Sequence, residues 1–157
     1  MSATALGDLV GRDGVVFDLP ASNKRAVVEG LGRQAAILAG IDANVVTNVI
    51  LEREALGSTG FGAGTAIPHG RLPGLSRIIA VAAKLAKPVD FAALDGLPVD
   101  LVVLMLAPIA GGGDHLKALA RVSRALRDAG FCARLRGAAS ADSFYAVLAG
   151  SSQSAAA

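Results

Sequence analysis

The stretch Arg53–Leu72 reads "REALGSTGFGAGTAIPHGRL" and contains five glycines, one proline and one of the protein's two histidines. Glycine loses more conformational freedom on folding than any other residue, so an ordered run of glycines needs a structural or chemical reason. Pro68 restricts the backbone just before His69, and Gly70 leaves space just after it. We therefore treat this stretch as the centre of the candidate site.

A nucleotide-binding loop is one interpretation of so many glycines, and the spacing disfavours it. A P-loop needs a lysine followed by serine or threonine after its second glycine, and the stretch has none. The dinucleotide fingerprint needs G-x-G-x-x-G between a strand and a helix, whereas the spacing here is G-x-G-x-G after an expected helix. A second interpretation is purely structural, with glycines at turns and His69 as an ordinary polar residue.

A third interpretation combines an anion-binding loop with a nucleophilic histidine. A neutral imidazole has a lone pair and an ordinary pKa of ~6.5, so His69 can accept a phosphoryl group near neutral pH. The product is strongly negative and needs donors from a guanidinium or from backbone N–H groups. Arg53, in the last turn of the preceding helix, can supply the guanidinium or can simply complement the helix dipole. The predicted phosphate-binding residues of the loop are Ser58, Thr59, Gly60 and Gly64.

The chain before the stretch predicts a strand and two helices. Residues 15–19 have strand character. A helix is expected over 23–39, with Ser22 as its N-cap and Gly40 as its C-cap. Asp42 is expected to cap a second helix that ends near Gly57 and buries one stripe of residues: Val45, Val46, Val49 and Ile50.

The chain after the stretch predicts two strands and further helices. The strands are expected over 77–85 and 99–107, and the second is apolar on both faces, which is typical of a central strand. Asp114 is expected to cap a long helix that ends at Gly130 and packs through Leu116, Leu119, Val122 and Leu126. A short element follows over 131–136, and Ser140 is expected to cap a last helix reaching Leu148. Residues 1–150 thus predict one α/β domain, and residues 151–157 predict a disordered tail.

Composition narrows the classes of function. The formal charge is only +2, and no basic cluster alternates with aromatic residues, which disfavours nucleic-acid binding. The longest apolar run, 101–110, is about half of what a membrane helix needs, and the beginning of the sequence does not resemble a signal peptide. Cys132 is the single cysteine and predicts no internal disulfide. We expect a cytoplasmic protein without membrane insertion.

The second histidine, His115, has two interpretations of its own. It shares a helical face with Leu119, Val122 and Leu126, so it can be a histidine at the edge of a packed face. It also lies in the first turn of its helix, where backbone N–H groups favour an anion. Two histidines without a cluster of cysteines or carboxylates make a poor zinc site, so no metal is expected.

The stretch Arg53–Leu72 resembles the active-site signature of the enzyme IIA proteins of the bacterial phosphoenolpyruvate-dependent phosphotransferase system, mannitol/fructose class. It is most similar to the nitrogen-regulatory branch, whose pattern is close to R-E-x-x-G-S-T-G-x-G-x-G-x-A-I-P-H-G-[RK], and it aligns without a gap. The resemblance extends to "LPVDLVVLMLAP" at 97–108 and to "DHLKAL" at 114–119. Thr65 departs from the pattern, since the family often has an aliphatic residue there.

The resemblance implies a fold and a set of roles. The fold is an α/β domain with a mixed sheet of about five strands flanked by helices. His69 matches the histidine that accepts a phosphoryl group, on Nε2, from a small histidine-phosphorylated carrier protein. His115 matches the second active-site histidine, and Arg53 matches the arginine that stabilises the phosphoryl group. The implied site needs no cofactor or metal.

The resemblance does not decide what the phosphorylated chain does next. A regulatory phosphocarrier, whose phosphorylation changes which partner protein it binds, is favoured because the signature leans to the nitrogen-regulatory branch. The alternative is a sugar-transport component that passes the phosphoryl group to an enzyme IIB domain. A binding module without chemistry is disfavoured by the presence of His69, His115 and Arg53 together. The regulated targets cannot be named from the sequence.

Overall fold

A mixed β-sheet covered by helices on both faces forms the domain, in a computed structural model that describes residues 5–110 and 112–150. The order in the sheet is β1-β5-β6-β3-β2, and β4 pairs with β6 beyond the end of β3. The strands are β1 Val15–Leu19, β2 Gly60–Gly62, β3 Thr65–Ala66, β4 His69–Leu72, β5 Ile79–Val89 and β6 Val99–Pro108.

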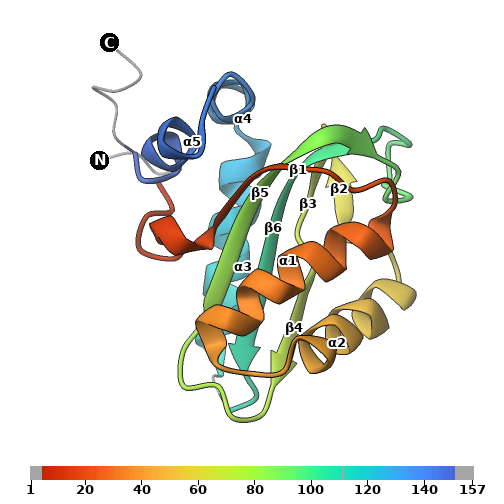
Figure 1. Ribbon diagram of the computed structural model, residues 1–157, viewed down its shortest axis with the longest axis vertical. Coiled ribbons are helices and arrows are strands. Elements are labelled where there is room, and N and C mark those ends of the chain that lie inside the picture. The colour runs from red at the N-terminus through yellow and green to blue at the C-terminus, as the bar shows by residue number, and fades with distance from the viewer. Residues whose placement is uncertain (1–4, 111, 151–157) are drawn as a thin grey trace.

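Over residues 5–110 and 112–150, five α-helices and a short 3-10 helix, η1 (Arg12–Gly14), accompany the sheet. Figure 1 shows α1 and α2 crossing the near face of the sheet, with α3 behind it and α4 and α5 at the upper left. The helices are α1 Lys24–Ala39, α2 Ala43–Ala55, α3 Gly113–Arg127, α4 Ala129–Arg136 and α5 Ala141–Leu148.

The sheet is mixed, as the resemblance implies. β1 runs parallel to β5, β5 antiparallel to β6, and both β3 and β4 run parallel to β6. β3 and β4 are two pieces along the same side of β6, separated by Ile67 and Pro68. The carbonyl of Pro68 still accepts from the Met105 N–H at 2.9 Å, which fixes the register of β4 where His69 begins it.

Each face of the sheet has its own core. One core lies between the sheet and α1 and α2, and the other between the sheet, the N-terminal segment and α3, α4 and α5. β6 contributes alternate side chains to both cores, for example Leu104 to the first and Met105 to the second. The prediction that residues 99–107 form a central strand is confirmed.

The predicted helix ends are partly confirmed. Gly40 ends α1 in the left-handed conformation at φ +69°, and Asp42 caps α2 by accepting from the Asn44 N–H at 2.8 Å. Ser140 caps α5 as expected. Ser22 is the wrong N-cap for α1, because the side chain of the next residue, Asn23, accepts from the Ala26 N–H. Both residue types are good caps, so sequence could not separate these neighbours.

The buried stripes of α2 and α3 differ from the predicted ones. Val45 is 44% exposed, and Leu116 is 64% exposed. α3 instead buries His115 and two alanines, because small side chains let the helix pack against β6. The buried residues of α3 are His115, Ala118, Val122, Ala125 and Leu126.

The boundaries of two other predicted elements also differ. α3 begins at Gly113 with Gly112 as its N-cap, so Asp114 lies inside the helix and does not cap it. α3 ends at Arg127, and Gly130 lies inside α4. Asp128 causes the break, since its side chain caps α4 by accepting from the Phe131 N–H.

Two further predictions concern the C-terminal tail and membrane-crossing helices. The tail predicted at 151–157 lies outside the described residues. Within the described residues, no helix is both long enough and apolar enough to cross a membrane.

Candidate functional site

His69 is the first residue of β4, and its ring is held in one orientation. Its Nδ1 lies 2.8 Å from the carbonyl oxygen of Ile67. A carbonyl oxygen only accepts, so Nδ1 carries the proton and Nε2 keeps its lone pair. The ring is partly buried, and Nε2 is the nucleophilic atom that this arrangement leaves for chemistry.

Gly70 is required by packing on the opposite face of β4. A Cβ atom at this position would lie 2.6 Å from Cγ1 of Val49 on α2. Successive side chains of a strand point to opposite faces, so Gly70 faces α2 and His69 faces the side of α3. The glycine after the histidine thus lets α2 lie close under the strand that carries His69.

His115 lies in the first turn of α3 and is 6% exposed. Its Nδ1 is buried and has no hydrogen-bond partner among the residues that the structure describes. Orphaned buried N–H groups are rarer than under-used acceptors. We therefore expect the neutral ring to carry its proton on Nε2, which makes His115 a donor where His69 is an acceptor.

The two histidines form one pair. Their ring centroids are 5.8 Å apart, and the ring planes are inclined by 47°. Burial lowers the pKa of His115 below its ordinary value of 6.5, and the charges of Arg71 and His69 lower it further. The lowered pKa favours the neutral form of His115.

We expect the free energy of unfolding to decrease as pH falls from about 7.5 to about 5.5. The pKa of His115 is lowered in the folded chain, so below 6.5 the unfolded chain binds more protons. The contribution is complete above 6.5 and is lost as pH falls through the lower, folded pKa. Urea unfolding at several pH values measures it. His115→Gln should show a smaller decrease, and equal decreases in the two proteins would contradict the assignment.

Arg53 lies in the last turn of α2, as the sequence predicts, and is partly buried. Its Nη1 donates to the carbonyl oxygen of Gly57 at 2.8 Å. This bond connects the guanidinium to the beginning of the glycine-rich loop. The role of Arg53 at a phosphoryl group stays a prediction.

The predicted loop donors are already engaged inside the protein. The Ser58 hydroxyl donates to the Phe91 carbonyl and accepts from the Gly60 N–H. The N–H and the hydroxyl of Thr59 both donate to the carboxylate of Glu54. The phosphate-binding role of these three residues stays a prediction, and their contacts show that they fix the beginning of the loop.

Gly64 is not brought close to His69 along the sheet. The next residue, Thr65, pairs with Leu101, whereas His69 pairs with Met105. Four residues of β6 span ~13 Å. Gly64 has φ +79°, and Gly62 has φ +126°, so both glycines lie where the turn between β2 and β3 requires positive φ.

That turn is held by three charged side chains from other parts of the chain. Asp95 accepts from the Ala63 N–H, and Arg136 donates to the Ala63 carbonyl. Arg136 also makes an ion pair with Asp100 at 2.8 Å. Ala63 itself has φ +56°, which sequence reasoning did not foresee.

We expect Gly64→Ala to destabilise the protein by roughly 1–2 kcal/mol or more. The left-handed conformation opposes any Cβ, and here a Cβ would lie 2.6 Å from Nη2 of Arg136. Gly62→Ala should also reduce stability, whereas Ala63→Ser should change it by less than about 0.5 kcal/mol, because Ala63 is exposed and already carries a Cβ. Urea unfolding of the three variants is the measurement, and equal tolerance at all three positions would contradict this account of the turn.

Sequence reasoning missed two residues of the site. Glu54 is 7% exposed and accepts from Lys24 Nζ at 2.9 Å as well as from Thr59, so it joins both near-face helices to the loop. Arg71 lies two residues after His69 on β4. A strand beginning after Pro68 would have placed Arg71 on the same face as His69, because side chains alternate along a strand.

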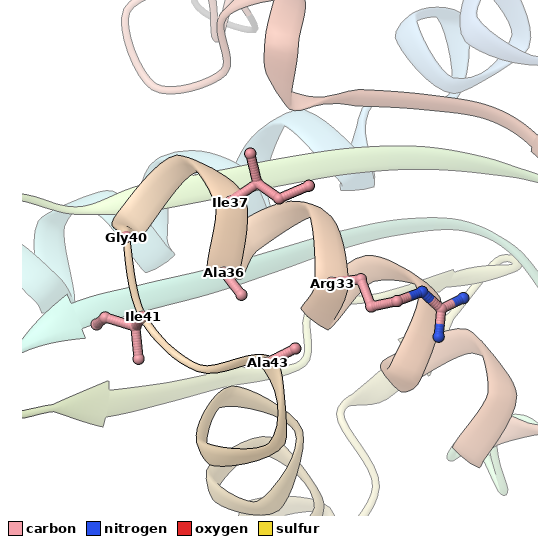
Figure 2. Close-up of a pocket in the computed structure, with 6 residues that line it drawn as sticks. All are labelled: Arg33, Ala36, Ile37, Gly40, Ile41 and Ala43. Carbon is pink, nitrogen blue, oxygen red and sulfur yellow. The ribbon is translucent and has the colours of Figure 1, made fainter.

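Two hollows lie near the helices. A cavity of about 670 Å³ is lined by His115, Asp114, Arg77 and Asp8, among others, and not by His69. A shallower hollow of about 410 Å³ lies between α1 and α2 and is lined mainly by apolar residues, with Arg33 at one end (Figure 2). This second hollow offers no nucleophile.

In the described ranges, no group of three or more His, Cys, Asp or Glu side chains is placed to hold a metal ion.

A comparison with known families covers almost the whole chain. Residues 8–151 match the family described as "Phosphoenolpyruvate-dependent sugar phosphotransferase system, EIIA 2". The match covers almost the whole chain, including β4 and the beginning of α3. The chain therefore belongs to the EIIA 2 family.

Within that family, the relatives include nitrogen regulatory proteins and a fructose-specific EIIA component of Haloferax volcanii that is 33% identical over 80% of this chain and 82% of that one. The chain is 46% identical over 142 residues to a "Nitrogen regulatory protein" of Bradyrhizobium diazoefficiens, covering 90% of this chain and 93% of that one. The crystal structure of nitrogen regulatory protein IIA-Ntr from Neisseria meningitidis superposes with a TM-score of 0.85 at 30% identity, over 90% and 97% of the two chains.

A more distant neighbour shares the fold. It is the enzyme IIA for mannitol of Escherichia coli, solved in complex with phosphorylated enzyme IIB for mannitol. The TM-score is 0.75 at 22% identity, over 90% of this chain and 97% of that one.

Proposed function

We propose that the chain is a phosphocarrier that accepts a phosphoryl group on Nε2 of His69 from a histidine-phosphorylated carrier protein. The observation that carries the proposal is the bond between His69 Nδ1 and the Ile67 carbonyl, which leaves the lone pair on Nε2. His115, with its ring centroid 5.8 Å from that of His69, supports it as a neutral donor at the same place. Family membership supports the same role.

The transfer is a displacement at phosphorus. The Nε2 lone pair of His69 forms the new N–P bond while the N–P bond of the donor breaks, and that electron pair returns to the donor nitrogen. A donor ring protonated on its other nitrogen leaves as neutral imidazole, and His69 keeps its Nδ1 proton on the Ile67 carbonyl. The step is symmetric and moves no net proton, so the chain contributes positioning and charge stabilisation.

We favour a regulatory output over transport. Relatives that are 35–46% identical are named nitrogen regulatory proteins, whereas a relative named a fructose-specific EIIA component is 33% identical. A phosphoryl group adds nearly two negative charges at His69. Leu116, which is 64% exposed next to His115, gives a partner protein an apolar contact at the same place. A partner that contacts this surface would therefore distinguish the two states of the chain.

The alternative is transfer onward to a IIB domain, and the mannitol complex supports it because that related fold is bound to a phosphorylated IIB. A binding module without chemistry is disfavoured, because such a module would not need a histidine whose Nε2 lone pair is held free for reaction.

One experiment tests the proposal and separates the outputs. The purified chain is incubated with phosphoenolpyruvate and the two general proteins of the phosphotransferase system, and its mass is measured. We expect a gain of one phosphoryl group; no gain would leave only the binding-module interpretation. A IIB domain is then added, and retention of the phosphoryl group supports regulation, whereas its loss supports transport.

A further inference from the structure

Arg71 projects from the same face of β4 as His69. β4 comprises His69–Leu72, and its side chains alternate. Gly70 and Leu72 face the core beneath α2, since a Cβ at Gly70 would meet Val49 and Leu72 is buried in that core. His69 and Arg71 therefore leave the strand on the other face, with Cα atoms ~6.6 Å apart.

The positive charge of Arg71 is also one of the causes that lower the pKa of His115. His115 lies on α3, and Arg71 lies on β4, so this influence crosses from strand to helix. The ring of His115 is in turn 5.8 Å from that of His69. Arg71 thus shares a strand face with one histidine of the pair, and its charge acts on the other.

Arg71 has no carboxylate partner in the part of the chain that the structure describes. Its side chain is exposed, and across residues 5–110 and 112–150 it makes no ion pair or hydrogen bond. Four other arginines are paired with carboxylates: Arg12, Arg25, Arg121 and Arg136. Other exposed arginines, such as Arg33 and Arg124, make none of these ion pairs either, and Arg71 differs from them in sharing a strand face with His69. A cation left unpaired beside two neutral histidines is a position that an arriving anion would complete.

We propose that Arg71 binds the phosphoryl group on His69 and supplies the positive charge that stabilises it during transfer. This inference rests on the proposed function, and it adds a second guanidinium to that of Arg53, which in the unphosphorylated chain donates to the Gly57 carbonyl.

The same charge has opposite effects in the two states of the chain. Before transfer it helps to lower the pKa of His115, which favours the neutral form of that ring. After transfer it attracts the oxygens of the new phosphoryl group. A guanidinium can bind two of those oxygens at once, whereas an ammonium acts as a point charge.

The test compares Arg71→Gln and Arg71→Lys with Arg33→Gln. Arg33 is an exposed arginine on α1 at the end of the apolar hollow in Figure 2, so its replacement removes the same charge away from the histidine pair. Two quantities are measured: the rate of phosphoryl transfer from the phosphorylated carrier protein, and the pKa of the phosphoryl group on His69 from the pH dependence of its ³¹P chemical shift.

We expect Arg71→Gln to slow transfer by about tenfold to a hundredfold, because a charge-assisted hydrogen bond is lost. It should also raise the pKa of the phosphoryl group, since the nearby cation no longer favours the dianion. Arg71→Lys should recover part of both effects, and Arg33→Gln should behave as wild type. The pKa of the phosphoryl group separates charge contact from a general structural effect.

Two failures are distinguishable. If the wild-type chain takes up no phosphoryl group, the proposed function and this inference both fall. If the wild-type chain is phosphorylated on His69 while Arg71→Gln matches Arg33→Gln in rate and in the pKa of the phosphoryl group, only the assignment of Arg71 is overturned.

Discussion

His69→Ala should leave the chain unable to take up any phosphoryl group. The reaction needs a nitrogen with an available lone pair, and the Ile67 carbonyl provides this at Nε2 of His69 by holding the proton on Nδ1. The nearby hydroxyls of Ser58 and Thr59 already donate to protein acceptors. Cys132 is buried, and burial raises the pKa of its thiol, so it is not a substitute nucleophile.

The measurement is phosphate incorporated per chain after incubation with phosphoenolpyruvate and the two general proteins. His115→Ala is the matched control, since it removes the other histidine of the pair and should slow phosphorylation without abolishing it. Urea unfolding of both variants shows that each is folded. Stoichiometric, acid-labile phosphate on His69→Ala would remove His69 from the reaction.

Arg53→Ala should slow phosphoryl transfer by about tenfold to a few hundredfold, the second-largest effect that we expect. Charge-assisted hydrogen bonds contribute roughly 1.5–3 kcal/mol each, and 1.4 kcal/mol corresponds to about tenfold in rate. Arg53 also donates to the Gly57 carbonyl, so its loss loosens the beginning of the loop as well. The measurement is the transfer rate from the phosphorylated carrier protein.

Arg53→Lys separates these two contributions. A lysine can still donate to one carbonyl oxygen such as that of Gly57, but it cannot reproduce the two-pronged guanidinium. Partial recovery of rate is therefore expected if Arg53 contacts the phosphoryl group. Full recovery would assign Arg53 to the loop alone, and a wild-type rate in Arg53→Ala would return it to the helix-dipole interpretation.

The order of elements could be predicted because their signals are local. Alternating and continuous apolar runs predict β1 and β6, and single capping residues such as Gly40 and Ser140 place helix ends. The face of α3 could not be predicted in this way. A prediction from sequence places the leucines of a helix on its buried face. In the structure, α3 packs closely against β6 through Ala118 and Ala125, and Leu116 is exposed.

The candidate site was predictable in its central residues and not in their support. His69 and His115 come from segments 46 positions apart, and the structure pairs them as the resemblance implies. The contacts that hold the loop come from distant residues, such as Phe91 to Ser58 and Arg136 to Ala63. No spacing rule relates such residues, because only the folded sheet and helices bring them together.

The tautomer of His69 is the central claim, and histidine ¹⁵N NMR tests it most directly. Before phosphorylation, long-range ¹H–¹⁵N spectra of the chain with ¹⁵N-labelled histidine should show His69 protonated on Nδ1 and unprotonated on Nε2. After phosphorylation, a one-bond ¹⁵N–³¹P coupling should appear on Nε2 of His69 and on no other nitrogen. A coupling on Nδ1 of His69 or on His115 would contradict the account.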